Sequence, residues 1–508
     1  MTSAAQTPPT RPLAELVRGL LEAPPGIRVS DVTLDSREAV AGTLFLACRG
    51  HTRHGLQFAG EAVARGARAV LFEPQEGEGS SPAPHFGEAV FVAAVPQLTR
   101  QAGVIADRFF EHPSHSLAVA AMTGTNGKTT CAWLLAQALT RCGRPAAYMG
   151  TLGFGFPGAL EDTQHTTADA VTVHRRLARL RGLGARWVGM EVSSHALDQE
   201  RIAGVRFHTA AFTNLSRDHL DYHGTMGAYG RAKARLFELE LESRVINIDD
   251  AFGVQLAARA TAETLIVTTR SGTAAPPPGA RRVHASQLRP ASPGLRMRIE
   301  SSWGEGELAV PLIGEFNADN ALTVLAILLG AQVPLAEALT ALGGCRGAPG
   351  RMEAFGGEGG RPLAIVDYAH TPDALEKALR NARLHCGARL HVVFGCGGDR
   401  DTGKRPMMGR IAAELADEVI VTDDNPRTEP PGRITADILS GIGPASRIRI
   451  EHDRRAAIRL ALAHCDPGDV VLVAGKGHEA YQIYGRERRS FRDQAVVREA
   501  LGLEGARS

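Results

Sequence analysis

The stretch Thr123-Gly-Thr-Asn-Gly-Lys-Thr-Thr130 decides how the centre of this chain folds. It follows an apolar run, 117–122, that predicts a buried strand, and it precedes 131–139, whose apolar residues recur at helical spacing. A strand, a glycine-containing turn with Gly-Lys-Thr, and a helix in this order are typical of a phosphate-binding loop. The glycines let backbone N–H groups converge on phosphate oxygens, and the helix N-terminus adds positive charge. The stretch therefore predicts a nucleotide-phosphate site.

Within this loop, Lys128 can reach the outer phosphates and the Thr129 hydroxyl can ligate Mg²⁺. The usual loop begins with glycine five residues before the Gly-Lys pair, where this chain has Met122. The loop is therefore a variant, and an ordinary glycine-containing turn is the alternative. The residues expected to cradle the phosphates are Gly124, Thr125, Asn126, Gly127, Lys128, Thr129 and Thr130.

Composition places the chain among globular proteins. Its 508 residues suggest about three domains, and 44% hydrophobic with 22% charged residues is an ordinary balance. A net charge of +2 gives no general reason to expect nucleic acid or membrane partners. The seven cysteines are scattered without metal-site spacing, so we expect reduced thiols. With neither a signal peptide at 1–9 nor an apolar run of about 20 residues, we expect a cytoplasmic protein. We also expect a monomer.

Alternating strand and helix patterns predict an α/β fold in three parts. Residues 1–115 form a small α/β unit, and 116–346 alternate around the phosphate loop in a way that favours a mainly parallel sheet. The Gly/Pro-rich stretch 343–351 is a good boundary, and a second open α/β sheet follows in 347–508.

The individual elements follow from hydrophobic periodicity. We expect strands at 29–34, 43–48, 67–72, 91–95, 117–122, 187–192, 208–213, 244–248, 264–268, 363–367, 390–394, 418–422 and 470–474, with shorter, antiparallel strands in 295–310. We expect helices at 11–21, 97–110, 128–140, 171–183, 226–240, 317–330, 372–384, 406–415, 433–441 and 453–464, and loops at 74–87 and 271–280.

Two polar segments follow predicted strands of the central part. Glu191 ends the run 187–191, and a carboxylate at the carboxyl end of a strand is well placed for Mg²⁺. The segment 214–224 holds two Asp, two His and an Arg. A solvated loop is the alternative for this segment, and zinc is less suited because oxygen ligands dominate. The upstream phosphate loop favours a metal–phosphate site.

Several motifs occur together in a fixed order, and together they resemble the Mur ligases of peptidoglycan synthesis. They are Thr123–Thr130, Glu191–His195, Asn214–Gly224, Gly314–Asn320, Pro349–Glu353 and Asp367–Leu375. Three further segments, Gly395–Pro406, Asp424–Arg427 and Ala474–Glu479, look like the branch of the family that forms UDP-N-acetylmuramoyl-tripeptide. The resemblance runs from about Leu34 to the last helix.

The resemblance implies an ATP-dependent acid–amino-acid ligase that forms ADP. It would add a diamino acid, meso-diaminopimelate being favoured, to UDP-N-acetylmuramoyl-L-alanyl-D-glutamate through an acyl phosphate. It also implies three domains: an N-terminal uridine-binding α/β domain (1–115), a central P-loop ATPase domain with a mainly parallel sheet (116–346) and a C-terminal Rossmann-like α/β domain (347–508). ATP, the UDP-muramoyl dipeptide and the diamino acid would be its partners.

The catalytic and nucleotide roles come from the same resemblance. Thr129, Glu191 and His219 would hold Mg²⁺, and Lys233 matches the family lysine whose carbamate binds a second Mg²⁺. Without the family, Lys233 would be interpreted as a surface helix lysine. The catalytic residues would be Lys128, Glu191, His219 and Lys233. Asn317 and Asn320 would lie beside adenine, while Arg351 and Asp367 would contact the phosphates and ribose.

The UDP-muramoyl peptide would be held by Ser36, in a uridine-site motif, and by Thr166, Thr167, Ser193, Gln199 and Arg201. Family members often have Asn where this chain has His165. Taken singly, Ser36 or Gln199 would be interpreted as a turn or surface residue.

The diamino acid would be read by Arg400, Asp424, Asn425, Pro426, Arg427, Gly475 and Glu479. An arginine fork can bind the second carboxylate of diaminopimelate bidentately, and Glu479 would hold its distal ammonium. Lysine or ornithine is the alternative substrate. Sibling ligases that add D-Ala-D-Ala or extend folylpolyglutamate, a non-catalytic muropeptide-binding regulator and a motion-coupled P-loop ATPase are the competing functions.

Overall fold

The computed structural model describes residues 10–50, 53–74, 85–163, 165–291, 294–443 and 447–503. The N-terminal segment 1–9 and most of the loop expected at 74–87 lie outside these ranges. The chain forms two compact units, Met1–Thr125 with Arg144–Arg244, and Asn126–Gly143 with Val245–Ser508. The domain boundaries expected after residues 115 and 346 stay predictions.

The first unit begins with a parallel sheet in the order β3 (Asp31–Thr33), β4 (Thr43–Ala47), β5 (Ala69–Phe72) and β6 (Phe91–Ala94). Alternate residues of these strands pack on opposite faces, against α1 (Leu13–Leu16) and α3 (Leu98–Phe109) or against α2 (Ala59–Ala64). The helix expected at 11–21 is wrong in extent. Pro12 is extended, and Arg11–Pro12 form β1, which pairs with β2 (Arg28–Val29), so only one helical turn remains.

The second sheet of this unit runs β10 (Ala159–Glu161), β9 (Gly153–Phe156), β8 (Ala146–Gly150), β11 (Trp187–Glu191), β7 (Ala118–Thr123) and β12 (Thr209–Phe212). The last four are mutually parallel, while β9 and β10 form an antiparallel edge. Helix α5 (Ala170–Gly182) covers one face with α6 (Ser194–Asp198). Helices α7 (Leu220–His223) and α8 (Met226–Ala234) follow β12 along the chain.

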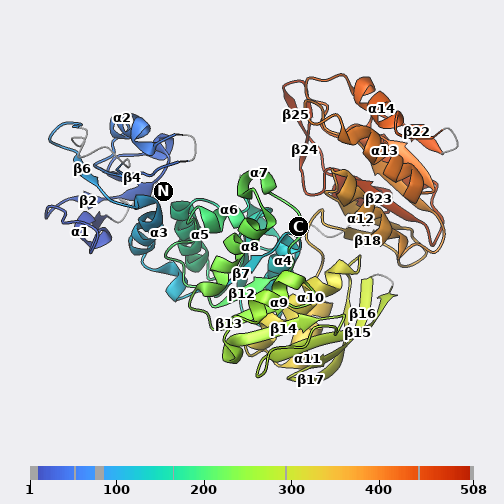
Figure 1. The fold of residues 1–508 in the computed structure, drawn as a ribbon. Helices are drawn as coiled ribbons and strands as arrows, with labels where there is room; N and C mark the ends of the chain where they lie inside the picture. Colours follow the sequence, from blue (N-terminus) through green and yellow to red (C-terminus); the bar gives the residue numbers. More distant parts are fainter. Residues whose placement is uncertain are drawn as a thin grey trace, which may run out of the picture. The chain divides into compact units, whose positions relative to one another are not determined.

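In the second unit, α4 (Lys128–Arg141) lies beside α10 (Phe316–Gly330), as Figure 1 shows. β13 (Ser243–Asn247) crosses the division between the units, and α9 (Ala251–Ala257) follows it. β14 (Leu265–Thr269) pairs in parallel with β15 (Arg281–Ala291), which continues antiparallel into β16 (Gly294–Ser301) and β17 (Gly304–Val310). The antiparallel strands in 295–310 and the loop at 271–280 are confirmed. Helix α11 (Leu335–Gly343) packs on β17.

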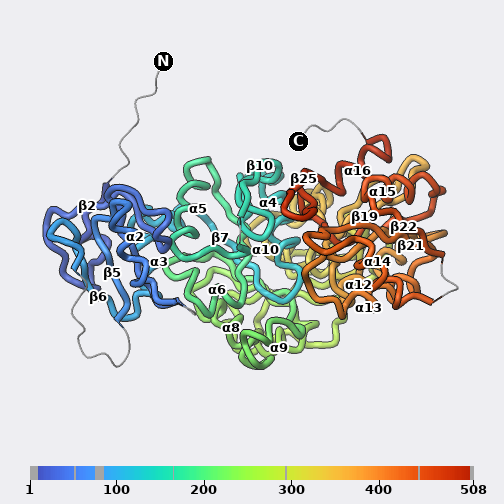
Figure 2. Tube along the Cα trace, turned by 90° about the horizontal axis from the view of Figure 1, so that it is seen from above, coloured from blue at the N-terminus to red at the C-terminus, as the bar shows by residue number. Residues whose placement is uncertain are grey.

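The last sheet has the order β18 (Glu353–Gly356), β19 (Leu363–Asp367), β23 (Val470–Ala474), β20 (Leu390–Phe394), β21 (Glu418–Val421) and β22 (Ile448–Ile450). Only β18 is antiparallel to its neighbour. In Figure 2, α15 (Arg454–Ala463) and α16 (Asp493–Ala500) lie on one side, and α12 (Pro372–Arg383), α13 (Lys404–Leu415) and α14 (Pro431–Leu439) lie on the other. Parallel strands gather the loops after Asp367, Phe394, Val421 and Ala474 at one edge. A hairpin, β24 (Tyr481–Tyr484) and β25 (Glu487–Ser490), follows.

All seven cysteines lie within the described ranges and are free thiols, as expected. No helix in the described part of the chain has both the length and the apolar character needed to cross a membrane.

Candidate active site

The phosphate loop joins β7 of the first unit to α4 of the second. Gly124 has a φ of +148°, and a Cβ on it would lie 1.9 Å from Thr213 Oγ1, so only glycine fits. Thr125 anchors the turn, because its N–H donates to Asn214 O at 2.8 Å and its Oγ1 accepts from Ser216 N at 2.9 Å. The strand–loop–helix order predicted from the sequence is confirmed.

The second half of the loop is fitted to α10. Gly127 has a φ of +89°, and a Cβ there would lie 2.2 Å from Asn320 Oδ1. Asn320 Nδ2 donates to Asn317 Oδ1 at 2.8 Å, and Asn317 Nδ2 donates to Ile313 O at 2.7 Å. Both asparagines are buried, so their amides support the N-terminal end of α4 here. The adenine contact expected for them stays a prediction.

Glu191 ends β11 and is 1% exposed. Its Oε1 accepts hydrogen bonds from the Tyr148 hydroxyl and, at 2.9 Å, from the Thr151 N–H, while Oε2 accepts from Thr151 Oγ1 at 3.2 Å. A buried carboxylate with several hydrogen-bond donors has a fixed orientation. Tyr148 and Thr151 were not predicted, since nothing in the sequence marks the turn after β8 as a partner of β11.

Most of the predicted muramoyl-peptide residues form one hydrogen-bonded network next to Glu191. Thr167 Oγ1 donates to Glu191 O at 3.0 Å and accepts from Ser193 N at 3.2 Å. Arg201 Nη1 donates to Thr167 O at 2.9 Å. The Thr166 hydroxyl lies 3.0 Å from that of Thr151. The structure therefore brings together side chains from three separate stretches of sequence.

The network continues outward through Gln199. Its Oε1 accepts from Arg201 Nε at 3.0 Å, and its Nε2 donates to the Tyr222 hydroxyl at 3.1 Å. Ser36 is not part of it. That side chain is buried at the carboxyl end of β3 and donates to Glu61 Oε2 at 2.7 Å. The burial of Ser36 excludes the interpretation as a surface residue, whereas its position in the 3₁₀ turn Ser36–Glu38 agrees with the interpretation as a turn residue.

Lys233 lies on α8 and is only 1% exposed, so its interpretation as a surface lysine is wrong. Its Nζ donates to Gly124 O at 2.8 Å and sits 4.5 Å from the centre of the Tyr229 ring. The side chain therefore reaches the backbone of the phosphate loop from a helix more than a hundred residues later.

His219 occupies a cluster of rings. It has a φ of +52°, and its ring centre lies 4.9 Å from that of His195 and 6.0 Å from that of Tyr229. Burial, together with the neighbouring imidazoles, lowers the pKa of His195 and that of His223. A carboxylate oxygen of Asp218 lies 3.6 Å from His219 Nε2. An imidazole nitrogen that carries no proton can serve as a ligand to a cation.

Arg351 and Asp367 lie together at the start of the last sheet. The Arg351 guanidinium sits 4.9 Å from the centre of the Tyr368 ring. Asp367 accepts from the backbone N–H groups of Met352 and Ala369, each at 2.8 Å. Burial and the nearby Arg351 charge lower the pKa of His478 to about 4, so that imidazole is neutral at pH 7. The positive charge here therefore belongs to Arg351.

The predicted diamino-acid residues gather at the carboxyl edge of this sheet. Asn425 Nδ2 donates to Glu479 Oε2 at 2.9 Å. Lys476 is fully buried and donates to the same oxygen at 2.9 Å and to Asn425 Oδ1 at 3.2 Å. Its Nζ also lies 3.6 Å from Asp424 Oδ1. Lys476 was not predicted, although it lies between two predicted residues of the segment 474–479.

Arg427 is held at this edge by its backbone and its side chain. It has a φ of +54°, its N–H donates to Ile483 O at 2.9 Å, and its Nη1 donates to Gly398 O at 2.8 Å. Pro426 is buried before it, and Arg400 is exposed. The Gly475 N–H donates to Asp367 O at 3.1 Å.

Another residue that was not predicted, Arg405, holds the loop that contains Arg400. Arg405 is fully buried, and its Nη1 and Nη2 grip the two carboxylate oxygens of Glu429 at 2.8 and 2.7 Å. This fork lowers the pKa of Glu429 to about 2. Glu429 in turn accepts from the Asp399 N–H at 3.1 Å, so Arg405 fixes the loop that carries Arg400.

Comparison with known proteins shows to which family the chain belongs. The patterns of the Mur ligase family catalytic domain, the Mur ligase middle domain and the Mur ligase glutamate ligase domain match residues 28–98, 122–328 and 350–477. The chain is 48% identical over 477 residues to UDP-N-acetylmuramoyl-L-alanyl-D-glutamate–2,6-diaminopimelate ligase of Ectopseudomonas mendocina, covering 94% of this chain and 96% of that protein. The chain belongs to the Mur ligase family.

Solved Mur ligase structures agree with this assignment. A structure named UDP-N-acetylmuramoyl-L-alanyl-D-glutamate–2,6-diaminopimelate ligase is 35% identical, with a TM-score of 0.72 over 97% of this chain and 99% of that one. The D-alanyl-D-alanyl-adding ligase of Acinetobacter baumannii is 18% identical, with a TM-score of 0.62 over 99% of each chain, and shows the shared fold. The three-domain α/β architecture expected from the sequence is that of the Mur ligases.

Proposed function

We propose that this Mur ligase adds meso-2,6-diaminopimelate to UDP-N-acetylmuramoyl-L-alanyl-D-glutamate at the expense of ATP. The observation that carries the choice of amino acid is the arrangement around Arg427, Asn425 and Glu479. It offers a guanidinium for the distal carboxylate and a carboxylate for the distal ammonium. The names of the relatives give the same pair of substrates.

The chemistry begins with a carboxylate, which is a poor electrophile. An oxygen of the glutamyl carboxylate attacks the γ-phosphorus of ATP, and ADP leaves. The amine of the diamino acid then attacks the acyl carbon, a tetrahedral intermediate forms and phosphate departs. The protein mainly has to position the reactants and neutralise charge.

The loop and its neighbours supply the phosphate-binding groups. Gly124, Thr125, Asn126, Gly127 and Thr130 would present backbone and hydroxyl donors, and Lys128 would neutralise the outer phosphates. Arg351 and Asp367 would contact the phosphates and ribose, and Asn317 and Asn320 would lie on the adenine side. The tight fit of Gly124 and Gly127 supports the phosphate assignment, because backbone N–H groups exposed by such turns attract anions.

The donor set also fits Mg²⁺. Glu191 is a preoriented buried carboxylate, and Thr129 and His219 would complete the ligands of one Mg²⁺, while carbamylated Lys233 would hold a second Mg²⁺. When bound, Mg²⁺ would neutralise charge on the transferring phosphoryl group. A buried ammonium at Lys233 would repel such an ion, whereas its carbamate is an oxygen ligand of negative charge.

The network from Thr166 to Arg201 would hold the muramoyl peptide, and Ser36 would contact the uridine. Arg201 is well suited to an anionic group, because it is already oriented by Gln199 and the Thr167 carbonyl. We also propose domains at 1–115, 116–346 and 347–508, a monomeric state, and a cytoplasmic location, where ATP and nucleotide-linked sugars occur. Light scattering of the purified chain tests the monomer.

A substrate panel tests the proposed function. Purified protein is given the UDP-muramoyl dipeptide, ATP and Mg²⁺ with meso-diaminopimelate, L-lysine, L-ornithine or D-Ala-D-Ala, and the product mass and ADP are measured. We expect one ADP per diaminopimelate-containing product. A clear preference for lysine or ornithine would overturn the amino-acid assignment. ADP formation without any ligated product would instead favour the simple ATPase, and no turnover at all would favour a binding regulator.

A further inference from the structure

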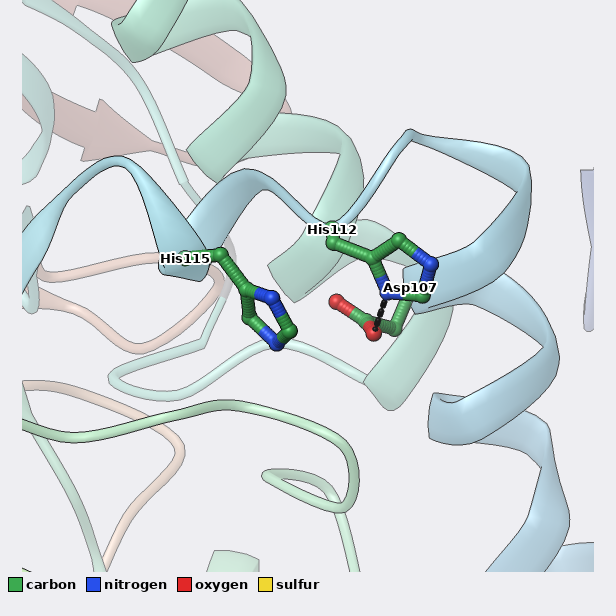
Figure 3. Close-up of side chains that lie close together, drawn as sticks. All are labelled: Asp107, His112 and His115. Carbon is green, nitrogen blue, oxygen red and sulfur yellow. Dashed lines mark hydrogen bonds and ion pairs between the residues drawn. The ribbon is translucent and has the colours of Figure 1, made fainter.

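A polar cluster lies at the end of α3, outside every site described above. It consists of Asp107 on α3 and of His112 and His115 in the turn that follows, where η3 (Pro113–His115) forms (Figure 3). One carboxylate oxygen and one nitrogen of each ring lie within 4.8 Å of one another. In Figure 3 the carboxylate points into the space between the two imidazoles.

The Asp107 side chain is nearly buried, and one of its two carboxylate oxygens has no hydrogen bond within the described part of the chain. Its side chain is 10% exposed, and Oδ2 lies 2.6 Å from His112 Nδ1. Oδ1 faces His174 Nδ1 at 3.4 Å, and neither of these buried atoms has a hydrogen-bond partner among the described residues. His174 Nε2 lies 2.9 Å from Ala203 O and donates to that carbonyl. A bound ion would explain a buried carboxylate oxygen that has no hydrogen bond.

The backbone of the turn 111–115 places the imidazoles of His112 and His115 next to each other. Glu111 and His112 have φ values of +60° and +50°, a left-handed conformation that non-glycine residues rarely adopt. The His112 N–H donates to Asp107 O at 2.8 Å, and the His115 N–H donates to His112 O at 3.0 Å. The rings stack with centres 5.1 Å apart. Because both histidines are exposed, an ion from solvent can reach them.

We propose that Asp107, His112 and His115 bind a divalent transition-metal ion of the Zn²⁺ class, with water as the remaining ligand. Two imidazoles and a carboxylate suit Zn²⁺ and its neighbours, whereas Mg²⁺ and Ca²⁺ prefer oxygen ligands alone. Bond lengths of about 2.0–2.2 Å place tetrahedral ligand atoms about 3.4 Å apart. The His112 Nδ1–Asp107 Oδ2 pair, now 2.6 Å apart, must therefore open, and more distant ligand atoms, up to 4.8 Å apart, must close in. The exposed rings have room to do so, and the ion takes the place of the proton between Asp107 and His112.

The test measures Zn²⁺ binding to the full chain. Protein stripped with chelator is titrated with Zn²⁺ by calorimetry, and with Co²⁺ by visible absorption, in excess Mg²⁺ so that oxygen-ligand sites are filled. We expect about one Zn²⁺ per chain, and at least about tenfold weaker binding in His115→Ala. His464→Ala is the matched control, since His464 is an exposed histidine outside the cluster.

The His115 side chain is exposed to solvent, so His115→Ala should keep the fold and the ligase activity. Asp107→Asn provides a second variant, which should weaken Zn²⁺ binding and abolish the intense Co²⁺ absorption. The proposal is overturned if the wild type does not bind Zn²⁺, if His115→Ala binds it as tightly as the wild type, or if His464→Ala weakens binding equally. The readout is metal affinity, so the outcome is independent of the ligase reaction.

Discussion

Replacing Lys476 with Met tests how the diamino-acid site is built. Lys476 is fully buried, donates to Glu479 Oε2 at 2.9 Å and to Asn425 Oδ1 at 3.2 Å, and lies 3.6 Å from Asp424 Oδ1. Methionine fills much of the same space without a charge. The variant therefore leaves the two side chains proposed to read the substrate without the ammonium that orients them.

The size of the effect follows from these contacts. A hydrogen bond to a charged group is worth about 1.5–3 kcal/mol, which corresponds to a change of about 10–100-fold. We expect the KM for diaminopimelate to rise by about that factor. Loss of one partner of a buried ion pair costs about 3–5 kcal/mol of stability, and the partial exposure of Glu479, 18%, places the loss toward the lower end.

The assay measures initial rates while each substrate is varied in turn. The KM for diaminopimelate should rise, and that for ATP should change little. Lys377→Met is the matched control, because Lys377 pairs with Asp373 on the surface and both side chains are largely exposed. An unchanged diaminopimelate KM in a folded Lys476→Met protein would refute the reasoning. Equal rises in both KM values would point to a damaged fold.

Four further changes have defined outcomes. Folding lowers the pKa of His478 from 6.5 to about 4, so protonating this imidazole below pH 6.5 destabilises the folded protein. The wild type should therefore lose about 2 kcal/mol of stability between pH 7 and pH 5, and His478→Gln should not lose this contribution. Denaturation midpoints at the two pH values measure the difference. The same change in stability with pH in the wild type and in His478→Gln would contradict this. Lys128→Ala should abolish ADP formation, and retained ligation would exclude the loop assignment. Lys233→Ala should be nearly inactive and partly rescued by short carboxylates; lack of rescue would count against the carbamate. Arg427→Ala should weaken diaminopimelate binding by at least about tenfold while sparing ATP, and equal losses in calorimetry would indicate misfolding.

The sequence predicted the last domain best, for a physical reason. Strands 363–367, 390–394 and 470–474 are continuous apolar runs buried on both faces, so their ends are sharp, and the structure has the same bounds. The edge strands β9 and β10 were missed because they are short, and β9 also contains two glycines. β15 was missed because its residues are mostly polar. Such strands depend on pairing with distant segments, which local periodicity does not report.

The site residues, like the strands, were predicted where the signal is local in the sequence and missed where it depends on distant segments. Motifs adjacent in sequence identified the phosphate loop and the Asp424–Arg427 segment. The residues that hold them in place were missed, because their partners are far along the chain. Tyr148 binds a carboxylate 43 residues later, and Lys476 binds an amide 51 residues earlier. The burial of Lys233 was equally hidden, since a helix lysine is usually exposed.

Oxygen transfer from substrate to phosphate tests the central claim, carboxylate activation by ATP, most directly. The UDP-muramoyl dipeptide is labelled with ¹⁸O in its glutamyl carboxylate, the complete reaction is run with meso-diaminopimelate, and the phosphate is analysed by mass spectrometry. The acyl-phosphate route predicts one ¹⁸O atom in each phosphate released during ligation. Unlabelled phosphate, or label appearing in AMP, would contradict it.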